Sequence, residues 1–430
     1  MNEILSGAKK FSGRLSVPGD KSISHRALMF SAVARGTSVI RGLSGGRDVA
    51  STTGCLRSLG VEISAGEPDT VTVRGVGKNG LRRPVGELDA GNSGTTIRLL
   101  SGILAGQDFP TRISGDRYLC QRPMGRIIEP LERMGARISA QAGGKPPLTI
   151  DGGGLEGIRY SLPVASAQVK SCVLLAGLYA RGRTTVAEKV ASRDHTERLL
   201  SLFGVEVRKA GLEVSLEGGA ELEAAEVRVP GDPSSAAFFA AAAAILSGGE
   251  VRIDNLCLNP TRAAFFEVLE KMGASVKRMN ERSQAGEPVA DLLVGSGKLT
   301  GCRVDGAILP SLIDEVPVLA VVASQAEGLT RICEASELRV KETDRLKAVH
   351  ENLTRMGAVV RELPDGLEIE GPVRLKGARL ESYGDHRIAM AFAVAALAAE
   401  GETLIEDAGC ADISFPGFFP LLRELSGLAR

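Results

Sequence analysis

The sequence repeats one pair of helical patterns along its whole length. An apolar helix pattern that ends in glycine is followed by a second that ends in Leu-x-x-φ-Gly, where φ is Met, Leu or Phe. The second pattern ends at Gly60, Gly135, Gly204, Gly273 and Gly357, and less clearly at Gly427. Successive copies are roughly 70 residues apart, which is too long for a solenoid repeat and suits a βαβ-type block. The sequence therefore predicts an α/β fold made of six copies of one unit.

The copies group as three plus three. Val17-Pro-Gly-Asp20 reappears as Val229-Pro-Gly-Asp232, each time just before an apolar helix pattern. Pro-Gly pairs mark turns, and here we expect the chain to pass between two bodies. Residues 19–230 are predicted to form one three-repeat domain and residues 1–18 with 231–430 the other, with a hinge near Pro18-Gly19 and Pro230-Gly231. A chain of 430 residues, 43% hydrophobic, is long enough for two such cores.

Composition argues against nucleic acids and membranes as partners. The 52 basic and 52 acidic residues balance, and aromatic residues make up only 4% with no Trp. A neutral surface with few stacking platforms is unsuited to non-specific nucleic-acid binding. The longest apolar stretches, 236–246 and 388–399, are shorter than the roughly 20 residues that span a bilayer, so they predict buried helices. The chain start lacks signal-peptide features and its seven cysteines contain no Cys-x-x-Cys, so we expect reduced thiols and a cytoplasmic protein.

Two glycine patterns resemble a dinucleotide-binding loop but lack its context. Gly75-Val-Gly-Lys-Asn-Gly80 and Gly152-Gly-Gly-Leu-Glu-Gly157 are followed by prolines where the nucleotide-binding helix should run. The sequence has no P-loop, its four histidines are isolated, and no His/Cys spacing resembles a zinc site. The residues therefore predict neither a dinucleotide site nor a structural metal.

Charged and polar residues gather at the predicted starts of the first helices of the repeats. Copy four has only capping residues, in Pro230-Gly-Asp-Pro-Ser-Ser235. The other copies carry Gly19-Asp-Lys-Ser-Ile-Ser-His-Arg26, Gly91-Asn-Ser-Gly-Thr-Thr-Ile-Arg98, Ser166-Ala-Gln-Val-Lys170, Ile313-Asp-Glu315 and Gly384-Asp-His-Arg387. An ordinary helix start needs only Asp or Ser as its N-cap. Lys21 and Arg26 instead stand near a positive helix end, and this placement indicates an anionic ligand.

The second helices add further charge at their own starts. Arg122 and Arg193 precede two of them, and Arg339-Val-Lys-Glu-Thr-Asp-Arg345 precedes another. Lys341 and Arg345 would share a face if the helix has already begun at residue 341. Taken alone, such a cassette is more often a solvated, salt-bridged helix start. Its combination with the motifs of the first helices favours a binding function.

These motifs resemble the signatures of the 5-enolpyruvylshikimate-3-phosphate synthase family. The resemblance rests on Gly19-Asp-Lys-Ser-Ile-Ser-His-Arg26, Asp89-Ala-Gly-Asn-Ser-Gly-Thr-Thr-Ile-Arg98, Arg339-Val-Lys-Glu-Thr-Asp-Arg345 and Gly384-Asp-His-Arg387, and covers nearly the whole chain. It implies two similar domains, each of three βαβαββ units arranged as an inside-out α/β barrel. It also implies transfer of the enolpyruvyl group of phosphoenolpyruvate to the 5-hydroxyl of shikimate 3-phosphate, with release of phosphate, by a monomer that needs no metal or organic cofactor.

The resemblance also assigns ligands, residue by residue. Shikimate 3-phosphate is expected to contact Lys21, Ser22, Arg26, Ser166, Ala167, Gln168, Asp314 and Lys341, with Ser192 or Arg193 in addition. Phosphoenolpyruvate is expected to contact Lys21, Gly94, Arg122, Gln168, Arg345 and Arg387. Lys21 and Gln168 would touch both substrates.

The implied chemistry needs a base for the 5-hydroxyl proton and an acid for the methylene carbon of phosphoenolpyruvate. Asp314 is the expected base and Glu342 the expected acid, and Lys21 completes the catalytic set. Arg122, Arg345 and Arg387 are suited to carboxylate and phosphate because a guanidinium binds them bidentately. Like charges about 4 Å apart repel by roughly 4 kcal/mol at an effective dielectric near 20. Converging cations therefore predict an open empty protein that closes on its substrates.

The chain departs from the family pattern in places. Ala167 stands where many members have a second Ser, which leaves only backbone to reach the substrate phosphate. Ile413 stands where some members carry a Lys, so one cation is missing near phosphoenolpyruvate. Gly94, beside the phosphoenolpyruvate site, leads us to expect sensitivity to glyphosate.

Two rival functions remain. The first is UDP-N-acetylglucosamine enolpyruvyl transferase, which shares the fold and the enolpyruvyl donor. Its family uses a Cys on a mobile loop. The candidate in this chain, Cys120, is interpreted as a residue without a catalytic role. The second is a binding or regulatory module related to RNA 3'-terminal phosphate cyclase. Neutral net charge, few aromatics and the Asp314/Glu342 pair argue against it.

Overall fold

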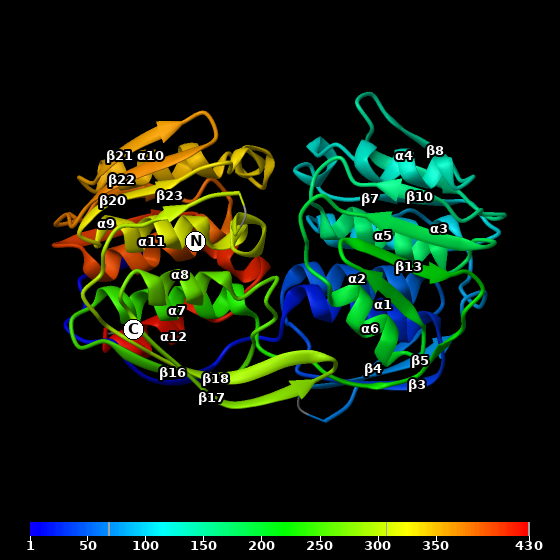
Figure 1. Cartoon of the computed structure of the whole chain (residues 1–430), viewed down its shortest axis with the longest axis horizontal. Coiled ribbons are helices and arrows are strands. Elements are labelled where there is room, and N and C mark those ends of the chain that lie inside the picture. Colours follow the sequence, from blue (N-terminus) through cyan, green and yellow to red (C-terminus); the bar gives the residue numbers. More distant parts are fainter. Residues whose placement is uncertain (68, 307, 429–430) are drawn as a thin grey trace. The chain divides into compact units, whose positions relative to one another are not determined.

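The computed structural model describes residues 1–67, 69–306 and 308–428 and divides the chain into two units (Figure 1). Unit 1 comprises Met1–Pro18, Pro230–Ser283 and Pro288–Arg430, and unit 2 comprises Gly19–Val229 and Gln284–Glu287. Residues 68, 307 and 429–430, which fall inside the predicted domains, lie outside the described residues. Because the two units are separate bodies, each is described by itself.

The units differ from the predicted domain bounds in two places. Pro230 groups with unit 1, and the segment Gln284–Glu287 groups with unit 2. The second difference has a physical cause, since the Gln284 side-chain amide donates to the carbonyl of Arg228 at 3.1 Å and Glu287 pairs with His195 at 2.7 Å. The chain therefore passes between the units at four points rather than at the two that Pro-Gly pairs mark.

The sheets of unit 2 resemble one another in strand order, and helices form some of the connections between their strands (Figure 1). The first sheet has the order β14-β3-β5-β4, with β15 also on β3, the second β6-β7-β9-β8 and the third β10-β11-β13-β12. In chain order the elements are α1 (Lys21–Val33), β3 (Ala34–Arg41), α2 (Arg47–Ser58), β4 (Glu62–Ala65), β5 (Thr70–Val76), β6 (Leu88–Asp89), α3 (Gly94–Ala105), β7 (Thr111–Ser114), the 3-10 helix η1 (Leu119–Gln121), α4 (Gly125–Arg133), β8 (Arg137–Gln141), β9 (Lys145–Asp151), β10 (Arg159–Ser161), α5 (Ala167–Gly177), β11 (Arg183–Ala187), α6 (His195–Leu202), β12 (Val207–Ala210), β13 (Glu213–Glu217), β14 (Leu222–Glu223) and β15 (Glu226–Arg228).

The sheets of unit 1 follow the same plan, with orders β17-β18-β16-β2, β19-β20-β22-β21 and β1-β24-β23. The last has three strands, and β1 from the N-terminus takes the place of a closing hairpin, which explains why the sixth repeat is weak in the sequence. The elements are β1 (Glu3–Ser6), β2 (Ser12–Ser16), α7 (Pro233–Ile245), β16 (Glu250–Cys257), α8 (Ala264–Lys271), β17 (Ser275–Gln284), β18 (Glu287–Gly295), β19 (Arg303–Val304), η2 (Leu309–Ser311), η3 (Ile313–Glu315), α9 (Val316–Ser324), β20 (Gly328–Ile332), η4 (Ser336–Val340), α10 (Arg345–Arg355), β21 (Val359–Leu363), β22 (Gly366–Gly371), β23 (Arg379–Glu381), α11 (His386–Ala398), β24 (Glu402–Glu406), η5 (Ala408–Ile413) and α12 (Phe418–Ser426).

Strand pairing follows from the connections. The strands on either side of α3, α5, α9 and α11 pair in parallel, as β10 and β11 do with Tyr160 opposite Val186, because a crossover returns the chain in the same direction. Short turns join β12 to β13 and β21 to β22, and these strands pair antiparallel. The sheets β6-β7-β9-β8, β10-β11-β13-β12 and β19-β20-β22-β21 each take all their strands from one copy of the repeated sequence pattern.

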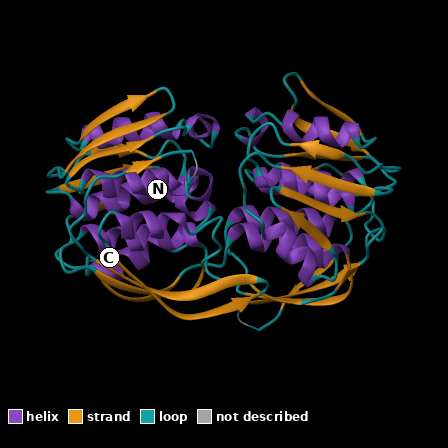
Figure 2. Cartoon of the chain, in the orientation of Figure 1, coloured by secondary structure: helices purple, strands orange, loops and turns teal. Residues whose placement is uncertain are grey.

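The first helices of the copies form the core of each unit. In α7 every residue from Pro233 to Ala244 is buried, and α11 is buried from His386 to Leu397, so the prediction of buried helices at 236–246 and 388–399 is confirmed. A helix that is apolar all round must be covered on every side. In Figure 2 the helices of each unit lie between strands. None of the helices in the described ranges is long and apolar enough to cross a membrane.

Glycines stop the second helices, which explains the Leu-x-x-φ-Gly pattern. Gly60 lies two residues beyond the end of α2 with φ of 89°, and Gly273 lies two residues beyond α8 with φ of 111°. A left-handed residue at this position satisfies the last helix carbonyls, and glycine adopts it without a steric penalty. The Leu and φ residues of the pattern are buried, as Leu56 and Leu59 are.

Candidate active site

Buried hydrogen bonds join α1, α2 and α3 in unit 2. His25 Nδ1 lies 2.6 Å from the hydroxyl of Thr52, which lies 2.7 Å from the hydroxyl of Thr96. Burial, together with the neighbouring charges of Lys21 and Arg26, holds the pKa of His25 well below its ordinary value. His25 is therefore neutral near pH 7, and it links the helices without adding a cation.

Arg26 links α1 to α5 and α6. Its Nε donates to the hydroxyl of Thr196 at 2.7 Å, its Nη2 to the hydroxyl of Ser171 at 2.7 Å and its Nη1 to the carbonyl of Ser22 at 2.8 Å. Burial lowers the pKa of Arg26 to about 10, against the opposing influence of Glu197, so it remains a cation at neutral pH. A buried arginine whose guanidinium is held by three hydrogen bonds can be oriented toward an anion.

Lys21 stands in the first turn of α1, directly after the N-cap Asp20, whose carboxylate accepts from the backbone N–H of Ile23 at 2.9 Å. Its ammonium lies 3.0 Å from Asp48, near the start of α2. Sequence reasoning missed Asp48, although an acidic residue in the first turn of α2 was the available signal. The carboxylate compensates the cation in the absence of a ligand.

Gly94, Arg122 and Gln168 lie around the start of α3. A methyl group built on Gly94 would lie 3.0 Å from Arg98 Nη1 and 3.3 Å from Arg122 Nη1. The same Nη1 of Arg98 donates to the side-chain oxygen of Gln168 at 2.7 Å. Arg122 Nη2 donates to Asn92 at 3.0 Å. The structure thus brings these predicted residues together, with Arg98 and Asn92 between them.

Four further predicted residues belong to the same part of unit 2. Ser166 is the N-cap of α5 and its hydroxyl oxygen accepts from the backbone N–H of Val169 at 3.4 Å, so its own O–H proton can be donated elsewhere. Ala167 begins α5, and Ser22 lies in the first turn of α1. Arg193 is close enough to Arg26 to lower the pKa of that guanidinium.

Ser192 has a structural role. Its backbone N–H donates to Glu188 at 3.2 Å, and its hydroxyl also donates to that carboxylate. A hydroxyl has one proton, so while this contact lasts Ser192 cannot donate to a phosphate. Of the two residues predicted as alternatives, Arg193 is therefore the better candidate ligand.

In unit 1 three cations surround the carboxylate of Asp314. Arg345 Nη1 lies 3.1 Å away, Arg387 Nη2 3.6 Å and Lys341 Nζ 3.9 Å. Asp314 lies in η3, at the start of α9, and Arg387 lies in the first turn of α11. The predicted residues of unit 1 therefore converge on the predicted base.

Arg345 is the most buried of these cations, with 1% of its side chain exposed. Its Nε donates to Asp385 at 2.7 Å and its Nη2 to Glu342 at 2.7 Å. Burial acts to lower the pKa of Arg345, but the carboxylates of Asp385, Glu342 and Asp314 outweigh it and raise that pKa above its ordinary value. The predicted acid and base are thus held by one guanidinium.

The start of α10 differs from one sequence expectation. The helix begins at Arg345, and its N-cap Asp344 accepts from the backbone N–H of Lys347 at 3.1 Å and pairs with Arg339 at 2.8 Å. Lys341 precedes the helix in an extended conformation. The two cations therefore do not share a helix face. They approach Asp314 because the chain turns between them.

A second layer supports Arg387. Its Nη1 lies 3.6 Å from Glu315, whose carboxylate accepts from the hydroxyl of Ser234 in the first turn of α7. Arg262 donates to Ser234 at 2.9 Å and to Asp232 at 2.8 Å. The start of copy four, interpreted from sequence as capping residues only, thus contributes through Ser234.

Ile413, at the position of the missing cation, packs against the core of unit 1.

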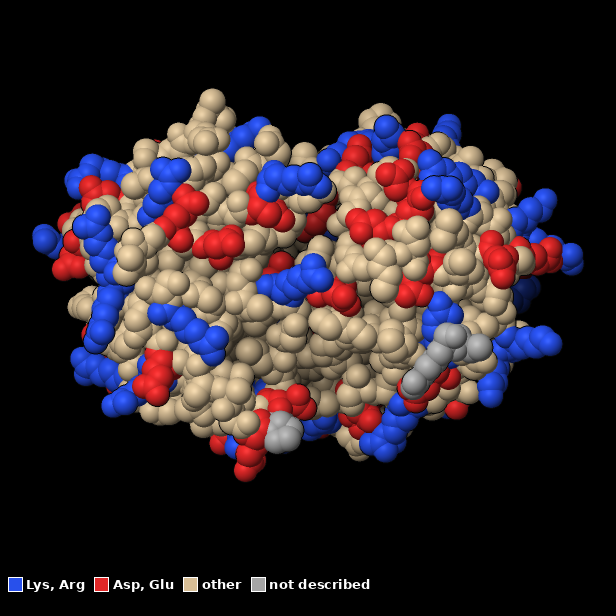
Figure 3. All heavy atoms as spheres, turned by 180° about the vertical axis from the view of Figure 1, so that it is seen from behind, with Lys and Arg blue, Asp and Glu red and all other residues tan. Residues whose placement is uncertain are grey.

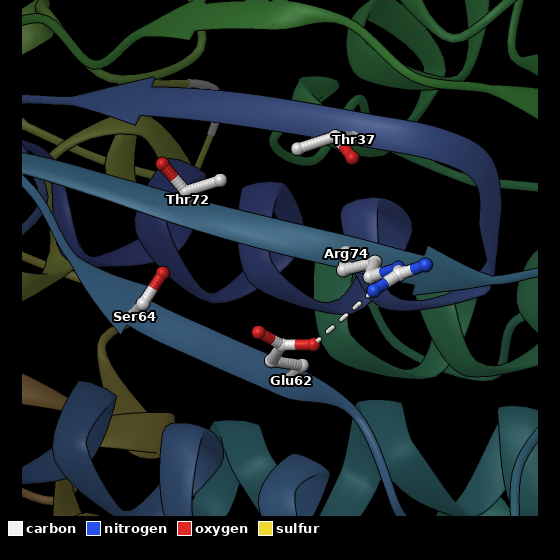
Figure 4. A pocket seen from close by; sticks show the side chains of 5 residues that line it. All are labelled: Thr37, Glu62, Ser64, Thr72 and Arg74. Carbon is white, nitrogen blue, oxygen red and sulfur yellow. Dashed lines mark ion pairs between the residues drawn. The ribbon is translucent and has the colours of Figure 1, made fainter.

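Other surface features do not coincide with these clusters. A cavity of about 320 Å³ in unit 2 is lined by Thr37, Glu62, Ser64, Thr72 and Arg74, whose side chains project from β3, β4 and β5 (Figure 4). None of the five is a predicted ligand, and Arg74 already pairs with Glu62 at 3.7 Å. In the described part of the chain, no group of three or more His, Cys, Asp or Glu side chains could hold a metal ion. On the face shown in Figure 3, Lys and Arg are interspersed with Asp and Glu.

An α/β fold that gathers cations and carboxylates at helix starts is typical of enzymes that act on anionic small molecules. The model of the EPSP synthase family, described as EPSP synthase (3-phosphoshikimate 1-carboxyvinyltransferase), matches residues 5–422. A 3-phosphoshikimate 1-carboxyvinyltransferase of a Synechococcus strain is 53% identical over 425 residues, which cover 98% of this chain and 96% of that one. The enzyme of the same description from Brevibacillus brevis is 51% identical over 420 residues, with 97% and 98% covered.

A solved structure gives the same assignment. The EPSP synthase of Acinetobacter baumannii is 44% identical, covers 100% of this chain and 98% of its own, and superimposes with a TM-score of 0.90. The chain belongs to the EPSP synthase family, and the resemblance of its motifs to that family is confirmed. It is therefore an enzyme of the 1-carboxyvinyltransferase type with a mixed α/β fold.

Proposed function

We propose that the chain transfers the enolpyruvyl group of phosphoenolpyruvate to the 5-hydroxyl of shikimate 3-phosphate and releases phosphate, as a step of the shikimate pathway to aromatic amino acids. The observation that carries the proposal is that the family match runs over residues 5–422 and so includes every helix start with a candidate ligand. Both substrates are polyanions. Cations at helix N-termini are therefore suited to them.

We assign the ligands to two clusters, one in each unit. In unit 2, shikimate 3-phosphate would contact Lys21, Ser22, Arg26, Ser166, Ala167, Gln168 and Arg193. Phosphoenolpyruvate would contact Lys21, Gly94, Arg122 and Gln168. In unit 1, shikimate 3-phosphate would contact Asp314 and Lys341, and phosphoenolpyruvate would contact Arg345 and Arg387. The contacts among Gly94, Arg122 and Gln168, and those of Asp314 with three cations, support this grouping.

The proposed chemistry moves two protons. Asp314 takes the proton of the 5-hydroxyl while the oxygen of that hydroxyl attacks C2 of phosphoenolpyruvate. At the same time Glu342 gives a proton to the methylene carbon, which becomes a methyl group. In the second step the methyl group returns a proton to Glu342, the C–O bond to phosphate breaks and the enol ether forms. The proton that Asp314 took from the 5-hydroxyl leaves with the phosphate. Lys21 would stabilise the departing phosphate charge.

The cations around Asp314 suggest how substrates activate it. Without substrate, Arg345, Arg387 and Lys341 stabilise the Asp314 carboxylate and weaken it as a base. Each of these cations is also assigned to a substrate carboxylate or phosphate. Substrate binding would draw them away from Asp314, which makes its carboxylate more basic when the 5-hydroxyl arrives.

We further propose that the two units act as domains, each an inside-out α/β barrel of three βαβαββ copies, with a hinge near Pro18-Gly19 and Pro230-Gly231. Substrate binding would bring their clusters together and exclude water before the reaction. The repulsion expected between converging cations is reduced, since Lys21 and Arg345 already pair with carboxylates. Closure therefore depends on the substrates bridging both clusters. Small-angle scattering should show a smaller radius of gyration with shikimate 3-phosphate and glyphosate than without ligand, and an unchanged radius would refute closure.

The remaining features of the proposal follow the family. We propose a cytoplasmic monomer that needs no metal or organic cofactor, binds neither nucleic acid nor membrane, and is inhibited by glyphosate at the phosphoenolpyruvate site beside Gly94. An inhibition curve that stays flat to high glyphosate concentration would contradict the last point.

The first test is phosphate release from phosphoenolpyruvate with shikimate 3-phosphate, and in parallel with UDP-N-acetylglucosamine. We expect release only with shikimate 3-phosphate. Release only with the nucleotide sugar would assign the chain to the rival transferase, and release with neither would overturn the proposed reaction. A filter-binding assay with RNA, expected to be negative, tests the module related to RNA 3'-terminal phosphate cyclase.

The second test removes the base. We expect Asp314→Asn to abolish turnover and leave shikimate 3-phosphate binding within about tenfold, because the amide keeps the shape of the side chain but cannot accept the proton as readily. Asp305→Asn is the matched control, since Asp305 lies in the same unit and makes an exposed ion pair with Arg303 at 3.4 Å. Turnover retained by Asp314→Asn would contradict the assignment.

A further inference from the structure

A buried ionic cluster lies beneath the start of α6 in unit 2, and the reaction proposed above does not use it. Lys170, on α5, has 1% of its side chain exposed. Its ammonium lies 2.8 Å from Glu188 and 2.8 Å from Glu197, and both carboxylates are themselves buried. Three charges are thus removed from water at one place, and we call Lys170, Glu188 and Glu197 the α5–α6 ionic cluster.

Stability alone is a poor explanation for this cluster. Desolvating charges costs several kcal/mol per ion, and buried ion pairs are often no more stabilising than apolar residues of the same volume. The cluster carries one positive and two negative charges, and Arg26 supplies the balancing positive charge close enough to interact with Glu197. The four charges together are neutral. Such an arrangement is suited to holding its neighbours in one geometry.

The neighbours of the cluster carry the candidate phosphate ligands. On one side, Lys170 donates to the carbonyl of Ser192 at 3.4 Å, and Glu188 accepts from the N–H of Ser192 at 3.2 Å and from its hydroxyl. All three polar atoms of Ser192 are therefore held by two side chains of the cluster. The next residue along the chain is Arg193.

On the other side, the cluster borders the partners of Arg26. Ser171 follows Lys170 on α5, and Thr196 precedes Glu197 on α6. Their hydroxyls lie 2.6 Å apart, and both accept from the Arg26 guanidinium at 2.7 Å. A change in the spacing of Lys170 and Glu197 would therefore move both acceptors of Arg26.

We propose that Lys170 is a positioning residue for shikimate 3-phosphate, which acts through Glu188 and Glu197 to hold Arg193 and Arg26 where both reach the phosphate group. The proposal rests on the proposed function and deepens it. The cluster touches no reacting atom of the proposed reaction. Its role is to hold two like-charged guanidinium groups near one another, an arrangement that is unfavourable without an anion between them.

The test compares Lys170→Met, which removes the charge and keeps much of the length, with Lys170→Arg, which restores a cation. Lys298→Met is the matched control, because Lys298 is 82% exposed and pairs with Glu327 at 3.1 Å in unit 1. Calorimetric titration with shikimate 3-phosphate gives Kd, steady-state kinetics give KM for each substrate, and thermal unfolding reports the fold. The wild-type chain is titrated first, since absence of binding there would refute the proposed function rather than the role of Lys170.

We expect Lys170→Met to raise the Kd and KM for shikimate 3-phosphate at least tenfold and the KM for phosphoenolpyruvate less than threefold at saturating co-substrate. Lys170→Arg should recover at least part of the affinity, and Lys298→Met should match the wild type. If Lys170→Met does not fold, Glu188→Gln takes its place, because its amide oxygen can still accept from Ser192, and the same split between substrates is expected. Unchanged affinity in a folded variant, or an equal loss for both substrates, would overturn the proposal.

Discussion

The pair between Arg345 and Asp385 offers the sharpest test of how the unit 1 cluster is held. Both side chains are buried, with 1% and 0% exposed, and Arg345 Nε lies 2.7 Å from Asp385. Asp385 is also the N-cap of α11, where it accepts from the backbone N–H of Arg387 at 2.8 Å. Asp385→Asn removes the charge but keeps an oxygen for the cap, since Asn and Asp cap helices about equally well.

The magnitude follows from the distance. At 2.7 Å and an effective dielectric near 20, the Coulomb attraction is about 6 kcal/mol. The loss on substitution is smaller, because Arg345 keeps Glu342 at 2.7 Å and Asp314 at 3.1 Å. The amide oxygen that caps α11 can also still accept from Arg345 Nη2, which lies 3.4 Å from the corresponding oxygen of Asp385. Loss of one partner from a buried pair typically costs about 3–5 kcal/mol, and we expect a value near the lower end, about 3 kcal/mol. For a unit of this size that corresponds to a fall in Tm of about 6–12 °C.

Urea unfolding and calorimetry of the Asp385→Asn protein measure this loss, with Asp305→Asn as the control. Asp305 makes an exposed pair with Arg303 at 3.4 Å, so the same substitution there should cost no more than about 0.5 kcal/mol. Because Arg345 and Arg387 are the proposed phosphoenolpyruvate ligands of this unit, the KM for phosphoenolpyruvate should also rise. A loss at Asp385 no larger than at Asp305 would refute the reasoning that the buried charge holds Arg345.

Three further predictions concern unit 2. Cys120→Ala should keep kcat within about twofold in the phosphate-release assay, because its thiol contacts a backbone carbonyl at 3.3 Å; a collapse of kcat would point to a catalytic thiol. Gly94→Ala should raise the KM for phosphoenolpyruvate more than that for shikimate 3-phosphate, since the added methyl lies 3.3 Å from Arg122 Nη1; equal KM changes would contradict this. Glu287→Ala should lower the free energy of unfolding by about 2–4 kcal/mol, because the fully buried His195 loses its partner at 2.7 Å. Urea titration measures this loss, and an unchanged midpoint of the unfolding transition would contradict the prediction.

Much of the fold could be predicted from the sequence because its signals are local. The glycines that end the second helices adopt the left-handed conformation there, and the apolar runs at 236–246 and 388–399 are buried helices. The starts of α1, α3, α5, α7 and α11 could also be predicted, since an Asp or Ser N-cap marks each of them. Two of the four passages of the chain between the units could not, because they depend on contacts of Gln284–Glu287 with residues far away in the sequence.

The candidate ligands could be predicted by type and motif, but their partners could not. Lys21 and Asp48 are 27 residues apart, and Arg345 and Asp385 are 40 apart. Neither separation corresponds to a helix or strand period, so only the fold brings these charges together. Lys170 shows the same limit, since a lysine inside an apolar helix gives no sign of the two carboxylates that surround it.

These carboxylates also bear on the repulsion expected between converging cations. Cations gathered for two polyanions would repel one another, yet Lys21 pairs with Asp48, Arg345 with Asp385 and Arg387 with Glu315. Each carboxylate stabilises its cation, and under the proposed assignment it would compete with the substrate that binds the same cation. Asp385 has no exposed surface and would hold Arg345 with or without substrate, whereas Asp314 would share its cations with the substrates. Under that assignment, the charges that stabilise the cluster would also delay the activation of Asp314 until both substrates have bound.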